Sequence, residues 1–148
     1  MAYETETIKG KLFEDNIFSF PIRIYYEDTD AGGIVYYANY LKFAERARTE
    51  YLRYIGINQE TMLKEKGIGF VVRECHINYK SPAKLDDVLN ITCKVTELKS
   101  VSLKMEQKLY RGDAILAEIE ITVVFLSLAT MRPTKIPNEI TDLIKLPA

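Results

Sequence analysis

The chain has 148 residues, a length typical of one domain whose core needs no disulfide or metal support. Its 20 Lys and Arg residues against 21 Asp and Glu give a net charge of −1, so no basic surface is predicted for nucleic acid or an anionic membrane. No apolar run approaches the ~20 residues of a membrane span, and the polar N-terminus lacks the apolar region of a secretory signal. We therefore expect a cytoplasmic protein.

The chain opens with a polar, acidic segment. We expect residues 1–16 to form a loosely ordered arm, and residues 17–148 to form a single domain. The first strand is predicted over residues 18–26, where Pro21 indicates an edge position or an entry point. An acidic turn with two consecutive glycines, Gly32 and Gly33, follows this strand and precedes a helix.

The apolar residues between Asn39 and Ile55 are spaced as in an α-helix, and charged residues take the other sides. The apolar positions are Tyr40, Ala44, Ala47, Tyr51 and Ile55. Asn39 is placed to cap the start of this helix, and Gly56 is placed to end it. A second, shorter helix is predicted over residues 58–66, with Gly67 at its end.

From residue 70 onward the apolar pattern has the two-residue period of strands. Four strands are predicted, over residues 70–79, 88–97, 101–109 and 115–125, and the short links between the last three favour antiparallel hairpins. A helix of about five turns covers one face of a wide sheet only if the sheet curls round it. We therefore expect an α+β domain with a strongly curved antiparallel sheet. The proline-containing tail from Arg132 carries a short helix near residues 138–144.

Asp30 is the first candidate catalytic residue. It lies between a strand and a helix start, where backbone amides lack intrahelical acceptors and the helix dipole is positive. Such amides can stabilise an oxyanion, so a carboxylate beside them is a minimal set of groups for acyl transfer. The alternative is that Asp30 only forms a turn or caps the helix, and for Asp28 a turn-forming role is expected.

Other catalytic motifs are absent from the sequence. It contains no Gly-x-Ser-x-Gly elbow, no phosphate-binding loop and no dinucleotide fingerprint. His76 is the single histidine, so histidine triads and multi-histidine metal sites are excluded. Its position in a strand pattern favours a structural or surface role. Cys75 and Cys93 have no metal-ligand spacing, and we expect both to be reduced thiols in the core. No metal site is predicted.

Residues 28–40 resemble the signature of the hotdog-fold thioesterases, which has the form Asp-x-Asp-x-x-Gly-x-Val followed by an aromatic pair and Asn-Tyr. In this chain the segment reads DTDAGGIVYYANY. The likeness continues through residues 43–50 (FAERARTE), 70–73 (FVVR) and 81–87 (SPAKLDD) and reaches Arg132-Pro133 and Ile136-Pro137 in the tail. The chain resembles most the Tol-Pal-associated acyl-CoA thioesterases of the YbgC type, and next the 4-hydroxybenzoyl-CoA thioesterases.

The resemblance implies a hotdog fold, in which a curved five-stranded antiparallel sheet wraps around one long helix. It implies an enzyme that hydrolyses thioesters of coenzyme A, or of an acyl carrier protein, to a free acid and a thiol. No metal and no redox cofactor is implied, because coenzyme A enters only as part of the substrate. A homodimer or homotetramer with active sites at the subunit boundary is implied as well. Neither a nucleic-acid partner nor stable membrane insertion is expected.

The resemblance also implies roles for particular residues. The catalytic aspartate of the family corresponds to Asp30, which acts in relatives as nucleophile or as general base. The oxyanion donor corresponds to a helix-start amide near Tyr37, and Gly33 would let the substrate carbonyl come close. Asn39 is a helix cap or positions substrate. Tyr37 stands where YbgC-type relatives usually carry histidine, so either only its amide matters or its side chain shifts acyl preference.

Three basic residues, Lys80, Lys84 and Arg132, are candidate contacts for the phosphates of coenzyme A, although scattered surface basic residues are common. Glu45, about two turns into the long helix, is either a solvated or interface charge or the counterpart of the helix carboxylate that distant hotdog branches use. The alternative function is that of a non-catalytic acyl-binding or scaffold protein in lipid or envelope metabolism.

Overall fold

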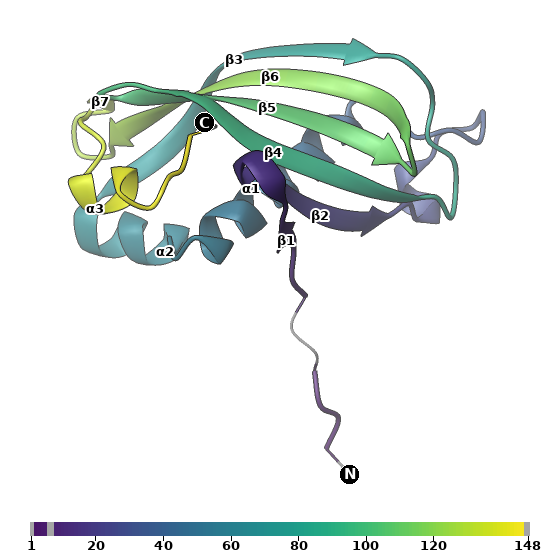
Figure 1. Ribbon diagram of the computed structural model, residues 1–148, viewed down its shortest axis with the longest axis horizontal. Coiled ribbons are helices and arrows are strands. Elements are labelled where there is room, and N and C mark those ends of the chain that lie inside the picture. The colour runs from purple at the N-terminus through teal and green to yellow at the C-terminus, as the bar shows by residue number, and fades with distance from the viewer. Residues whose placement is uncertain (1, 6–7, 147–148) are drawn as a thin grey trace.

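A long helix lies against one face of a curved antiparallel sheet (Figure 1). The computed structural model describes residues 2–5 and 8–146. The helix, α1, spans Asn39–Tyr54, which confirms the predicted range to within one residue. Five strands are long: β2 (Phe18–Arg23), β3 (Ile68–Tyr79), β4 (Val88–Leu98), β5 (Ser102–Arg111) and β6 (Ala114–Ser127). The predicted α+β architecture is confirmed.

The order of the strands leaves β3 at one edge of the sheet. The long strands follow the order β2-β4-β5-β6-β3, and every neighbouring pair is antiparallel. On one side β3 pairs with β6 from Ile68↔Ser127 to Tyr79↔Ala117. Its other side faces no strand of the described chain. A 12-residue strand with an unpaired edge offers backbone donors and acceptors to a second chain.

Two short strands extend the sheet beyond the five predicted ones. β1 (Lys11–Leu12) pairs with β2, and β7 (Arg132–Pro133) pairs with β6. The predicted arm over residues 1–16 is therefore attached to the sheet at Lys11 and Leu12 and includes a 3-10 turn, η1 (Glu14–Asn16). Residues 1, 6 and 7 of the arm lie outside the described residues. Strands of two residues show no period, so the sequence pattern does not reveal them.

The shorter helices lie close to their predicted places. α2 (Gln59–Thr61) continues into a π-helical segment, η3 (Met62–Lys66), which Gly67 ends with a φ of +62°. The Asn58 side chain accepts a hydrogen bond from the Thr61 amide at 3.1 Å and so caps α2. α3 (Asn138–Thr141) is shorter than the predicted helix over residues 138–144. The predicted first strand ends at Arg23, and its last residue, Tyr26, begins the 3-10 turn η2 (Tyr26–Asp28).

One cluster of buried apolar residues joins the helix to the sheet. It includes residues from Phe18 to Ile144, which supports the proposal of one domain over residues 17–148 as far as the described chain reaches. The alternation predicted for β4 is confirmed, since its inward residues are all buried: Leu89, Ile91, Cys93 and Val95. Burial raises the pKa of the Cys93 thiol to about 12. Cys93 is a free thiol buried in the core, as the sequence predicts.

The prediction that Cys75 is also a core thiol is wrong, because this residue is exposed. Cys75 lies opposite the buried Ile121 in the register of β3 and β6. The two-residue period thus identifies the side of the sheet that Cys75 faces, but not that its strand is at the edge. His76, the next residue, is exposed with its Nε2 3.9 Å from Glu74 Oε1, which agrees with the predicted surface role.

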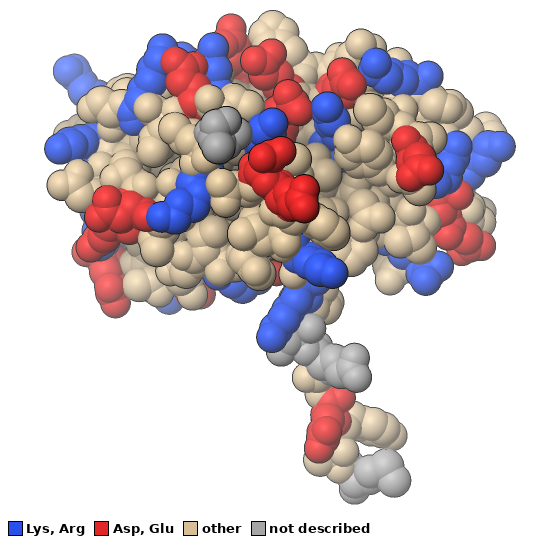
Figure 2. Space-filling model, in the orientation of Figure 1, with Lys and Arg blue, Asp and Glu red and all other residues tan. Residues whose placement is uncertain are grey.

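The surface carries charges of both signs. Figure 2 shows basic and acidic side chains interspersed over the visible face, in keeping with the net charge of −1. This face therefore has no single-sign field of the kind that attracts nucleic acid. Among the described residues, every helix falls short of the length and apolar character needed to cross a membrane.

Candidate active site

The segment between β2 and α1 carries the residues that the sequence singles out. Its first part is fixed by Asp28, which is buried with 8% of its surface exposed. The Asp28 carboxylate accepts a hydrogen bond from the Tyr25 amide at 2.8 Å, and its own amide donates to the Tyr25 carbonyl at 3.0 Å. Asp28 is therefore a turn former, as predicted.

Asp30 lies on a tight loop that immediately follows this turn. Its amide donates to the Ile34 carbonyl at 2.8 Å, and its carbonyl accepts from the Gly33 amide at 3.0 Å. The Asp30 carboxylate oxygen Oδ1 accepts from the Gly32 amide at 2.8 Å. An aspartate that only forms a turn makes the same bond. Whether Asp30 is catalytic or only forms the turn, the bond to Gly32 orients its carboxylate. The second oxygen, Oδ2, has no protein partner among the described residues.

Gly33 adopts a backbone conformation in this loop that other residues rarely adopt. Its φ is +82°, in the left-handed region that favours glycine, and the space where a side chain would stand is open. The loop is closed by a bridge between Thr29 and Val35, and a second bridge joins Ile34 to Lys84. The carboxylate of Asp30 thus stands on a hydrogen-bonded, exposed loop.

The start of α1 is tied to the acidic turn through one carbonyl. The Asp28 carbonyl accepts both the Tyr36 amide at 3.0 Å and the Asn39 side-chain amide at 2.9 Å. The prediction that Asn39 caps the helix is corrected, because Ala38 occupies the capping position without a side-chain bond. Asn39 is the first helical residue, and its side chain donates to the turn rather than accepting from the helix.

The two amides directly before α1 are free within the described chain. The Asn39 amide donates to the Tyr36 carbonyl at 2.8 Å, and the Leu41 amide donates to the Ala38 carbonyl at 3.2 Å. The amides of Tyr37 and Ala38 have no acceptor among the described residues. Free amides at a helix start are the groups that can bind an oxyanion. The side chain of Tyr37 is 62% exposed.

The three candidate phosphate contacts lie at two ends of the sheet. Lys84 is exposed and its backbone forms the bridge to Ile34, beside the Asp30 loop. Lys80 directly follows β3, and its Nζ lies 3.7 Å from Glu118 Oε1. Arg132 pairs with Ser127, at the Ile68 end of β3. The 12 residues of β3 separate Arg132 from the two lysines by roughly 36 Å of extended chain.

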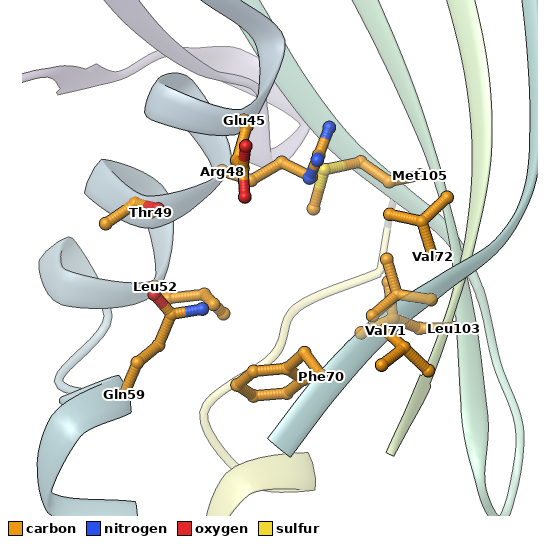
Figure 3. A pocket seen from close by; sticks show the side chains of 11 residues that line it. Glu45, Arg48, Thr49, Leu52, Gln59, Phe70, Val71, Val72, Leu103 and Met105 are labelled. Atoms are coloured by element: carbon orange, nitrogen blue, oxygen red, sulfur yellow. The ribbon is translucent and has the colours of Figure 1, made fainter. Parts of the chain in front are cut away.

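A cavity of about 110 Å³ lies between α1 and the first half of β3 (Figure 3). Its walls combine apolar side chains of the sheet, such as Phe70 and Val72, with Glu45 and Arg48 of α1. Glu45 is exposed at this cavity, and Asp30 does not line it. Because β3 is the edge strand, the cavity lies next to the unpaired edge of the sheet.

A buried glutamine supports the helix side of this cavity. Gln107 is fully buried; its side chain accepts from Arg48 at 2.8 Å and donates to the Ala44 carbonyl at 2.9 Å. Burial lowers the pKa of the Arg48 guanidinium from its ordinary value. The sequence carries a signal for this contact, since Gln107 is a polar residue at an inward position between Met105 and Leu109.

Replacing Gln107 with Leu is expected to lower the free energy of unfolding by about 2–3 kcal/mol, because the Ala44 carbonyl and the Arg48 guanidinium lose a buried partner. Urea denaturation measures this change. Gln59→Leu, at a partly exposed residue of the same cavity, is the control and is expected to change stability by less than about 0.5 kcal/mol. An unchanged urea midpoint in the Gln107 variant would mean that the buried network adds nothing to stability.

Comparison with known proteins identifies the family. The model of the thioesterase-like superfamily matches residues 25–144. The chain belongs to this superfamily. It is 48% identical over 126 residues to the acyl-CoA thioesterase YbgC of Haemophilus influenzae, covering 85% of this chain and 93% of the relative. To the acyl-CoA thioester hydrolase YbgC of Escherichia coli O157:H7 it is 42% identical over 125 residues, with 84% and 92% covered.

The solved structures agree with this superfamily assignment. A probable thioesterase from Bartonella henselae superposes with a TM-score of 0.78 at 33% identity, covering 82% of this chain and 99% of that one. The hotdog fold predicted from residues 28–40 is therefore confirmed for this thioesterase-like chain. The matched range begins at Tyr25 and so includes the Asp30 loop and the start of α1.

Proposed function

We propose that this protein hydrolyses acyl-CoA thioesters to a free acid and coenzyme A, with Asp30 as the catalytic carboxylate. The observation that carries the proposal is the 48% identity, over 85% of the chain, to an acyl-CoA thioesterase of Haemophilus influenzae. The geometry supports it, because an oriented carboxylate and the free Tyr37 amide belong to one segment that hydrogen bonds tie together.

Asp30 can act in thioester hydrolysis by either of two routes. As a general base, the carboxylate takes a proton from water, the hydroxide adds to the thioester carbonyl, and the C–S bond breaks to release the thiolate, which is then protonated. As a nucleophile, the carboxylate itself adds to the carbonyl and expels the thiolate, and water then hydrolyses the resulting anhydride. In both routes negative charge develops on the carbonyl oxygen, where the Tyr37 amide is proposed to donate.

Pairing of two chains along β3 would complete the site. In an antiparallel pair formed about the middle of β3, the Tyr79 end of one strand lies beside the Phe70 end of the other. The Asp30 loop, which reaches the Tyr79 end through Tyr37 and Lys84, would then face the cavity of its partner. We therefore propose a homodimer, with association of two dimers into a tetramer as the alternative.

We propose that Lys80 and Lys84 contact the phosphates of coenzyme A, since both lie at the end of the sheet that carries the Asp30 loop. Arg132 lies at the opposite end, so in the proposed dimer only the partner's copy would approach the same site. A cytoplasmic location remains a prediction from the sequence, and so does an acyl carrier protein as a second source of substrate.

The test is a thiol-release assay with short-chain, long-chain and aromatic acyl-CoAs, and with one acyl carrier protein thioester. Release of thiol with a defined acyl preference is the expected result. A Tyr37→His variant that changes the preference between aliphatic and aromatic acyl groups would show that the Tyr37 side chain, and not only its amide, affects acyl preference. Saturable binding of the same compounds without release of thiol would favour the acyl-binding alternative.

A further inference from the structure

Tyr79, the last residue of β3, reaches the segment that precedes α1. Its hydroxyl donates to the Tyr37 carbonyl at 3.0 Å, a contact between residues 42 positions apart. The ring packs edge-on against the Tyr40 and Tyr37 rings, with centroids 5.4 Å and 6.0 Å away. Tyr40 is buried, and its hydroxyl accepts the Ala83 amide at 3.0 Å. Tyr79 is thus held by a fixed neighbour even though 41% of its own surface is exposed.

Hydrogen bonds hold Tyr37 on both sides. The peptide group before it is fixed by the Asn39 amide, which donates to the Tyr36 carbonyl at 2.8 Å. The peptide group after it is fixed by the Tyr79 hydroxyl on the Tyr37 carbonyl. A carbonyl that accepts a hydrogen bond polarises the N–H of its own peptide group. The Asn39 bond therefore polarises the Tyr37 N–H, and the Tyr79 bond polarises the Ala38 N–H. Because both peptide groups that flank Tyr37 are held, the free Tyr37 amide has a fixed direction.

The Tyr79 hydroxyl remains a donor at neutral pH. Burial, and then the nearby Tyr37, Cys75 and Tyr40, raise the pKa of Tyr79 above its ordinary value. The hydroxyl therefore keeps its proton throughout the range in which a carboxylate base is active. The bond to the Tyr37 carbonyl is accordingly present over that range.

We infer that Tyr79 is a positioning residue for thioester hydrolysis, whose hydroxyl holds the Tyr37 backbone so that the Tyr37 amide donates to the substrate carbonyl oxygen. The inference rests on the proposed function and extends it to a residue outside the Asp30 segment. Tyr79 acts through the backbone and does not touch the reacting atoms. Because 41% of Tyr79 is exposed, removal of its hydroxyl affects stability little, whereas an oxyanion donor is sensitive to displacements of about 1 Å.

Tyr79→Phe tests the inference, because it keeps the ring and removes only the hydroxyl. We expect kcat to fall about 10- to 100-fold, with KM changed by less than about 2-fold because substrate contacts remain. The pH at which kcat/KM rises is expected to stay the same, since Asp30 is untouched. A shift of the Tyr37 and Ala38 amide signals in ¹⁵N NMR spectra of the free protein provides a readout besides activity.

Tyr54→Phe is the matched control, because Tyr54 is exposed at the far end of α1 and packs on Phe18. The inference is overturned if kcat of the Tyr79 variant is unchanged, if KM rises alone, or if its urea midpoint falls in step with activity. A wild-type protein that releases thiol and loses this activity in Asp30→Asn, but not in Tyr79→Phe, would refute only the role of Tyr79. No thiol release by the wild-type protein would overturn both the inference and the proposed function.

Discussion

Replacing Asp30 with Asn is expected to lower kcat for acyl-CoA hydrolysis by about 10²–10⁴-fold, the range for removal of a positioned proton-transfer group. The amide side chain has the size of the carboxylate, and its oxygen can still accept the Gly32 amide bond of 2.8 Å. The loop is therefore kept while the negative charge is lost. Neither attack on the carbonyl nor removal of a proton from water is available to an amide.

The measurement is thiol release under saturating substrate, with circular dichroism to show that the variant is folded. Asp86→Asn is the matched control, because Asp86 is another exposed turn aspartate, with a φ of +71°. Asn adopts this conformation readily, so the control is expected to retain its activity. Near-normal turnover in a folded Asp30→Asn variant would mean that Asp30 only forms the turn, a role that its bond to the Gly32 amide already explains.

Much of the fold is predictable because it follows from local periods. The alternation in residues 88–97 identifies the side of β4 that faces the helix, and Leu89 and Ile91 are buried as a result. The same period cannot show which strand ends at the sheet edge, because strand order depends on pairing between distant segments. Cys75 illustrates this limit, since its alternation is that of a core residue and its exposure is that of an edge strand.

In the candidate site, too, local features are predictable from the sequence and contacts between distant segments are not. The turn at Asp28 follows from local chemistry and is seen in the structure. The positive φ of Gly33 is a separate finding, because the prediction for this residue concerns only close approach of the substrate carbonyl. The bond from the Asn39 side chain to the Asp28 carbonyl is not predictable from helix-capping preferences, which place an acceptor at that position. The Tyr79 contact is less predictable still, because it depends on β3 ending beside the Tyr37 segment.

Disruption of the β3 edge is expected to abolish both the dimer and most of the activity. Cys75 lies near the middle of β3 and is exposed in the single chain, so Cys75→Asp leaves the fold of one chain intact. In a dimer paired along β3 the two new charges lie close together, where like charges on neighbouring strands repel and burial of a charge is costly. We expect light scattering to give a dimer or tetramer for the wild-type protein and a monomer for the variant.

The loss of activity follows from the position of Asp30 on an exposed loop that does not line the cavity of its own chain. If the partner supplies the facing wall, a monomer cannot hold the acyl group against the carboxylate, and kcat/KM falls on the order of 10²-fold or more. Cys75→Ser removes the same thiol without adding charge and is expected to remain oligomeric and active. A folded monomer with full activity would mean that one chain holds a complete site, and that the unpaired edge of β3 has no part in catalysis.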